Sequence, residues 1–224
     1  MAAVKKIDLA LQGGGAHGAF TWGVLDRLLD ETNIEIRGLS GTSAGAMNAA
    51  VMASGYAHDG RVGAQHALEK YWRTVSDAAT FSPFQRSFLD RILGHWTLDY
   101  SPTYAIADTM GRIMSPYDTP LGGVNILKDI LEENVDYKAL VKSPVKVFIT
   151  ATNVRTGRGR VFYPNELNSD VLLASACLPT LFRAIEIDGD PYWDGGYSGN
   201  PSLVPLIKEC DSMDTIIVQI NPYE

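Results

Sequence analysis

The sequence GTSAG at residues 41–45 constrains the fold of this chain more than any other feature. Ile34 to Leu39, just before it, has the apolar character of a short strand. The small residues from Ser43 to Ser54 predict a helix that ends at Gly55. A serine between a strand and a helix in the pattern GxSxG occupies a strained turn that exposes its hydroxyl. Ser43 is therefore predicted to be a nucleophile.

A second unit of the same kind comes earlier in the chain. Residues 7–12 alternate like a strand, glycines follow at 13–15, and apolar residues at helical spacing run from Ala19 to Glu31. Two successive units of strand, turn and helix predict a parallel sheet covered by helices. Four further features are expected in the second half. Residues 145–150 and 160–163 should form a hairpin, and a helix should run from Asn168 or Ser169 through Cys177, where Pro179 stops it. A hairpin turn is expected at Asp188-Gly189-Asp190, and a strand of the buried type at 214–220.

Length and composition indicate one globular domain over residues 1–224. The chain has 224 residues, of which 46% are hydrophobic and 20% charged. Its formal net charge of -7, without a basic stripe, argues against nucleic acid as a partner. Cys177 and Cys210 lack the spacing of metal ligands, so we expect two reduced thiols and no metal.

No stretch of the sequence has the length and apolar character of a secretion signal or a membrane span. We therefore expect a cytoplasmic protein whose only contact with a membrane is peripheral. The chain stops at Glu224, soon after the strand expected at 214–220, as a piece of a longer protein would. The sequence predicts no oligomeric state.

The glycine-rich turn GGGAHG at residues 13–18 also matches the GxGxxG pattern of dinucleotide-binding turns. Such a site needs an acidic residue about 20 positions later, at the end of the second strand, to hold the ribose. The chain has LSGTS at that place, residues 39–43, so the nucleophile turn replaces the acid. The turn is better explained as an oxyanion hole, in which several amides face one point.

No histidine is placed to complete an α/β-hydrolase triad, which runs Ser, then Asp or Glu, then His along the chain. The histidines are His17, His58, His66 and His95, all well before the later sheet segments. His17 lies in the glycine-rich turn, where a turn role or a substrate contact is expected rather than a base.

Asp194, in the sequence YWDGG, is the remaining candidate for the base. Two glycines after the acid allow a tight turn that exposes the carboxylate, and the preceding aromatic residues would shield it from water and raise its pKa. An ordinary Asp-Gly-Gly surface turn is the alternative interpretation.

Together, the three motifs resemble those of the patatin-like phospholipases, which share a glycine-rich oxyanion loop, GxSxG and a later Asp-Gly-Gly in this order. The resemblance implies a three-layer α/β sandwich with a mainly parallel central sheet flanked by helices. It implies that Ser43 is the nucleophile and Asp194 the base, with no cofactor. It also implies an oxyanion region made of Gly13, Gly14, Gly15, Gly18 and the amide of Ala44.

The same resemblance implies hydrolysis of a phospholipid, lysophospholipid or neutral lipid ester through an acyl-enzyme. A variable helical cap would occupy about residues 56–125. Within it, the amphipathic segment Phe84 to Trp96 would either line the acyl site and touch the lipid surface or pack into the core. His17 departs from the family pattern, because many members carry Arg or Lys there, so the resemblance implies no cationic contact to a headgroup at this position.

Three other functions fit part of the sequence. A small-ester or thioester hydrolase would turn over a soluble short-chain substrate as fast as a lipid at an interface. A nucleotide-binding module would bind nucleotides whether or not Ser43 is present. An inactive scaffold finds little support, because both Ser43 and Asp194 are intact.

Overall fold

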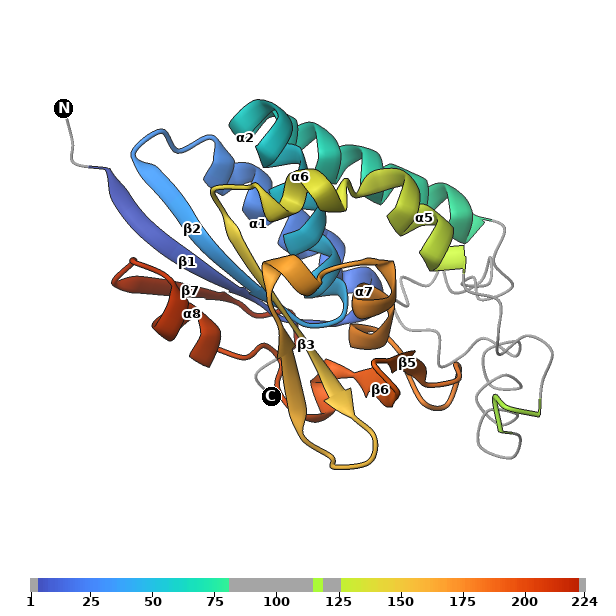
Figure 1. The fold of residues 1–224 in the computed structure, drawn as a ribbon. Coiled ribbons are helices and arrows are strands. Elements are labelled where there is room, and N and C mark those ends of the chain that lie inside the picture. The colour runs from blue at the N-terminus through green and yellow to red at the C-terminus, as the bar shows by residue number, and fades with distance from the viewer. Residues whose placement is uncertain (1–3, 81–114, 119–125, 222–224) are drawn as a thin grey trace.

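The computed structural model describes residues 4–80, 115–118 and 126–221. Its seven strands are β1 (Lys5–Leu11), β2 (Ile34–Gly41), β3 (Lys146–Asn153), β4 (Gly159–Phe162), β5 (Ile185–Ile187), β6 (Asp190–Asp194) and β7 (Asp214–Val218). They form one sheet in the order β5-β6-β3-β2-β1-β7, with β4 also paired to β3 (Figure 1). The centre of the sheet, from β3 to β7, is parallel, and β4, β5 and β6 extend it with antiparallel pairs.

Helices cover both faces of this sheet, in unequal numbers. They are α1 (Gly18–Leu29), α2 (Ala44–Thr80), α5 (Ile126–Asn134), α6 (Tyr137–Val141), α7 (Ser169–Ser175) and α8 (Val204–Glu209). Side chains alternate across strand β1: Leu9 and Leu11 join the large core beneath α1, α2 and α7, whereas Ala10 between them packs with Leu206 of α8. The protein is therefore a three-layer α/β sandwich, which confirms the predicted fold class.

Helix α2 does not end at Gly55, so that prediction is wrong. The helix continues to Thr80 and breaks instead at Asp59 and Gly60, where Gly60 has φ 54°. A side chain at Gly55 would lie 2.4 Å from the carbonyl oxygen of Gly63. Gly55 thus allows the two halves of α2 to approach each other closely, and the left-handed Gly60 makes the turn between them.

Strand β7 is not the buried strand expected at 214–220, and this prediction is also wrong. Among the described strands it pairs with β1 alone, at the edge of the sheet. Ile216 and Ile217 are exposed, and only Val218 is buried. A continuous apolar run indicates a strand but does not indicate whether helices cover it.

The other elements of the second half follow the sequence more closely. Strands β3 and β4 form the expected hairpin, and β5 and β6 are joined by a turn with positive φ at Asp188 and Gly189. The side chain of Asn168 caps α7 by accepting from the amide of Val171. Helix α7 ends at Ser175, two residues before the expected end.

Most of the expected cap, residues 56–125, and all of the segment Phe84 to Trp96 lie outside the described residues. Of the described part, residues 61–80 form the second half of α2, where Leu68, Tyr71 and Trp72 belong to the main core. Within the described ranges, no helix has both the length and the apolar character needed to cross a membrane.

Replacing Gly45 by alanine is expected to lower the free energy of unfolding by about 3 kcal/mol or more, because α2 begins against the end of β1. A side chain at Gly45 would lie 2.1 Å from the carbonyl oxygen of Leu11. Gly23→Ala is the matched control, since nothing lies within 4 Å of that position on α1. The control should be neutral or should stabilise by about 0.5–1 kcal/mol in urea unfolding. Equal effects of the two substitutions would contradict the close approach.

Candidate active site

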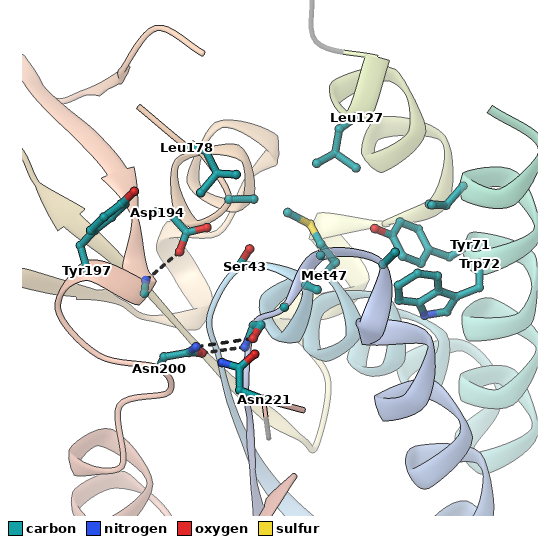
Figure 2. A pocket seen from close by; sticks show the side chains of 18 residues that line it. Ser43, Met47, Tyr71, Trp72, Leu127, Leu178, Asp194, Tyr197, Asn200 and Asn221 are labelled. Carbon is teal, nitrogen blue, oxygen red and sulfur yellow. Dashed lines mark hydrogen bonds between the residues drawn. The ribbon is translucent and has the colours of Figure 1, made fainter. Parts of the chain in front are cut away.

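Ser43 occupies the turn between β2 and α2, at the edge where parallel strands end. Its φ is 54°, a left-handed conformation that is strained for a residue with a side chain. Gly13, which follows the neighbouring strand β1, leaves room for this turn, because a side chain at Gly13 would lie 2.7 Å from the Cβ of Ser43. The hydroxyl projects into a cavity, as the GxSxG pattern predicts (Figure 2).

Asp194 ends strand β6 and lies opposite Ala151 of β3. Asp194 is only 7% exposed, and its carboxylate accepts a 2.7 Å hydrogen bond from the amide of Gly196. Burial raises the pKa of this carboxyl above its usual range, although hydrogen bonds from Gly196 and from the Ser43 side chain oppose that shift. The structure thus brings Ser43 and Asp194 together, across 151 residues of sequence.

The glycine-rich turn lies beside Ser43, but its amides are not equivalent. The amide of Gly13 donates to the side-chain oxygen of Asn200 at 2.6 Å. The amide of Gly18 donates back to the carbonyl oxygen of Gly15. Among the described residues, no acceptor is found for the amides of Gly14, Gly15 and Ala44. These three remain the candidates for an oxyanion hole, whereas Gly13 and Gly18 have other roles.

Gly18 is a packing residue at the start of α1. A side chain there would lie 2.8 Å from the Cβ of Ala44 and 3.0 Å from the ring of Trp72. The buried amide of Asn48 donates to the carbonyl oxygens of both Gly18 and Ala44, and its own oxygen accepts from the indole of Trp72. This network fixes the beginnings of α1 and α2 against each other, and with them the glycine-rich turn and Ser43.

A cavity of about 610 Å³ opens over these groups. Figure 2 shows Ser43 at its centre, with Asp194, Tyr197 and Asn200 on one side and Tyr71, Trp72 and Leu127 on the other. The second side is an apolar wall, here defined as Met47, Tyr71, Trp72, Val75 and Leu127. Sites for extended apolar ligands have this character, with a few polar groups at one end.

No histidine lines the cavity among the described residues. His17 is exposed on the turn and is not among the residues that line the cavity, and Nε2 of His58 lies 3.2 Å from the carboxylate of Asp136 on another part of the surface. His95 lies outside the described residues. Within those residues, no cluster of His, Cys, Asp or Glu is arranged to hold a metal ion. Among the described residues that line the cavity, Asp194 is the carboxylate.

Sequence reasoning missed the apolar wall and Asn200. Tyr71 and Trp72 belong to a stretch whose structure the sequence did not indicate. Asn200 lies 187 residues from Gly13, to which it also donates from Nδ2 at 3.5 Å. A polar residue a few positions after Asp-Gly-Gly indicates a contact to the glycine-rich turn only weakly, because asparagine before proline is common in turns of any kind.

Substituting alanine for Asn200 is expected to lower the turnover of ester substrates about 10-fold or more, because the glycine-rich turn would lose the side chain that fixes its backbone. The protein should remain folded. Asn134→Ala provides the control, since the Asn134 amide donates only to Ile130 of its own helix, away from the cavity. Turnover that is unchanged in Asn200→Ala, or equally reduced in both variants, would contradict a role in positioning the turn.

A family model described as patatin-like phospholipase matches residues 9–207. The structure of VipD from Legionella pneumophila resembles this one with a TM-score of 0.50 and 16% sequence identity, over 95% of this chain and 49% of that chain. The ExoU chain of the heterodimeric ExoU-SpcU complex from Pseudomonas aeruginosa gives a TM-score of 0.39 and 18% identity, over 98% of this chain and 48% of that one.

The resemblance to VipD, at 16% sequence identity, is a resemblance of fold. The chain spans about half the length of each of the two solved chains. A comparison with curated proteins found no significant match.

Proposed function

The chain belongs to the patatin-like phospholipase family, a family of lipid hydrolases, and on that premise we propose that it hydrolyses lipid esters with Ser43 as nucleophile and Asp194 as base. The substrate is an ester with a long acyl chain, such as a phospholipid, a lysophospholipid or a neutral lipid. The reaction passes through an acyl-enzyme on Ser43, and no cofactor takes part.

One observation carries this proposal: a serine in a strained turn and a buried carboxylate line the same apolar cavity, and the serine side chain lowers the pKa that burial raises on the carboxylate. A nucleophile and a base within hydrogen-bond reach are the arrangement that nucleophilic catalysis requires. Burial favours the proton on Asp194 and so makes its carboxylate a stronger base than an exposed one.

Acylation begins when the carboxylate of Asp194 takes the proton from the hydroxyl of Ser43 as its oxygen attacks the ester carbonyl. The amides of Gly14, Gly15 and Ala44 are the donors proposed for the negative charge on the carbonyl oxygen. Loss of one such donor typically costs about 100-fold or more in rate. The proton on Asp194 then passes to the leaving alcohol, and the acyl group remains on Ser43.

Deacylation repeats the same steps with water. Asp194 takes a proton from water as its oxygen attacks the acyl-enzyme, and it returns that proton to the oxygen of Ser43 as the fatty acid leaves. One carboxylate can serve both half-reactions because it ends each of them unprotonated. A histidine is therefore not required.

The apolar wall supports a long acyl chain as the group transferred to Ser43. Val75 lies on this wall, so Val75→Phe is expected to lower kcat/KM for long-chain esters about 10-fold or more through crowding of the cavity. Acetyl and butyryl esters, whose short acyl groups need little of the cavity, should be hydrolysed as by the wild type. Val62→Phe is the control, since Val62 is 51% exposed on the same helix.

Hydrolysis of p-nitrophenyl esters of increasing chain length, and of a lysophospholipid in micelles, measures both variants. A wild-type chain that prefers soluble short-chain esters, with no effect of Val75→Phe on any chain length, would favour a small-ester or thioester hydrolase. Nucleotide binding that survives Ser43→Ala, without hydrolysis of any ester, would favour a binding module.

A further inference from the structure

We infer that Ser175 is a positioning residue for the nucleophile: its buried hydroxyl holds the backbone of Ser43 in the strained turn and fixes it to the strand beside the base. This role rests on the proposed function of Ser43 and Asp194. Ser175 is not among the residues that line the cavity. It lies at the end of α7 and is 0% exposed.

The hydrogen bonds of this hydroxyl have a defined direction. Ser175 Oγ lies 2.7 Å from the carbonyl oxygen of Thr150 on β3, which can only accept, so the hydroxyl proton points there. The backbone amide of Ser43 lies 2.9 Å from the same Oγ and donates to it. One hydroxyl thus uses its donor and an acceptor lone pair to connect the nucleophile turn with strand β3.

The two connected groups are those that set the distance between nucleophile and base. The amide of Ser43 belongs to the residue with φ 54°, whose conformation must be held by its surroundings. Thr150 precedes Ala151, the partner of Asp194 in the sheet, and a side chain at Gly195 would lie 2.1 Å from the carbonyl oxygen of Thr150. The oxygen that Ser175 binds therefore also lies close against the turn that follows Asp194.

Ser54 offers a matched control elsewhere in the fold. It is 3% exposed on helix α2, and its hydroxyl accepts a 2.9 Å hydrogen bond from the backbone amide of Asp136. Ser54→Ala and Ser175→Ala each leave a buried backbone amide without its acceptor. Ser175→Ala also leaves the carbonyl oxygen of Thr150 without its donor, so it should reduce stability somewhat more than Ser54→Ala does. Only Ser175 is connected to Ser43.

The test compares both alanine variants and the wild type in two assays, reaction with a fluorophosphonate and hydrolysis of a p-nitrophenyl ester. We expect Ser175→Ala to lower the fluorophosphonate rate and kcat together, about 10-fold or more, with KM changed by less than about 3-fold. Ser54→Ala should leave all three values unchanged. Ser175→Cys, which keeps a weak donor and acceptor, should fall between alanine and wild type and provides the same test where Ser175→Ala does not fold.

The pH profile separates positioning from general loosening of the site. Without Ser175, the hydrogen bond from Ser43 that lowers the pKa of Asp194 would weaken, so the acid limb should stay in place or move to higher pH. A loosened site would admit water, relieve the burial that raises the same pKa, and move the limb to lower pH.

Each failure has a distinct result. A folded wild-type chain that does not react with the fluorophosphonate would contradict the proposed function itself. A reactive wild type would overturn the role of Ser175 alone if kcat of Ser175→Ala stayed within about 2-fold, if Ser54→Ala lost as much, or if the acid limb moved to lower pH.

Discussion

Replacing Ser43 by alanine is expected to lower the rate of fatty acid release by at least ~10³-fold while the protein remains folded, because the substitution removes the atom that forms the acyl-enzyme. Release of fatty acid from a lysophospholipid, followed with time, measures the effect. Ser54→Ala is a suitable control, since it removes a serine hydroxyl that is buried at a distance from the cavity.

A second substitution at the same position tests the strain. Ser43→Gly should be as inactive as Ser43→Ala, but it should raise the free energy of unfolding above that of the alanine variant by about 1 kcal/mol, because glycine adopts φ 54° without penalty. Activity of several per cent in either variant would mean that another group is the nucleophile. Equal stability of the two variants would mean that the turn stores no strain.

Asp194→Asn is expected to reduce hydrolysis by a comparable factor, at least ~10³-fold, because an amide cannot take the proton from Ser43 or from water. The amide oxygen of asparagine can still accept from Gly196, so the turn should keep its shape. Asp190→Asn, on the same strand, is the control, since Asp190 is paired with Arg155 at the surface. Comparable activity of Asp194→Asn and the wild type would remove Asp194 from the mechanism.

The pH dependence of the wild type follows from the raised pKa of Asp194. The base must be unprotonated, so activity should fall as the pH decreases through this pKa, at a pH above the usual range of an aspartate. In Asp190→Asn the acid limb should not move. An acid limb at the pH of an ordinary exposed carboxyl would show that Asp194 is not the group that limits the rate.

Stability should change in the opposite direction. A carboxyl with a raised folded-state pKa binds its proton more tightly in the folded chain, so its contribution to stability is most favourable below the unfolded pKa and declines as the pH rises through the folded one. Asp194→Asn removes this decline. The variant should therefore gain stability relative to the wild type as the pH rises through that window, which urea unfolding at several pH values would measure.

The centre of the fold could be predicted because local patterns determine it. The strand before Gly13 and the strand before Ser43 each end in a glycine-containing turn and a helix, and parallel strands bring such turns to one edge of a sheet. Ser43 and the adjacent glycine-rich turn could therefore be located together from sequence alone. Asp194 required the Asp-Gly-Gly motif in addition, because β6 joins the sheet by antiparallel pairing that no local pattern specifies.

The rest depended on contacts between distant segments. The amide of Gly13 fits the oxyanion pattern in the sequence, yet the structure pairs it with Asn200, 187 residues away. Gly55 has the appearance of a helix end, yet it is the point where the two halves of α2 meet near Gly63. Glycine has more than one use, and its use in a given place is determined by the backbone that approaches it.

Covalent labelling of Ser43 tests the central claim most directly. The purified chain is treated with a fluorophosphonate, and the intact mass and the labelled peptide are measured for the wild type, Ser43→Ala and Asp194→Asn. The proposed dyad predicts one adduct on Ser43 in the wild type, none in Ser43→Ala, and much slower labelling in Asp194→Asn. A folded wild-type chain without an adduct, or with its adduct on another residue, would contradict the assignment of Ser43 as the nucleophile.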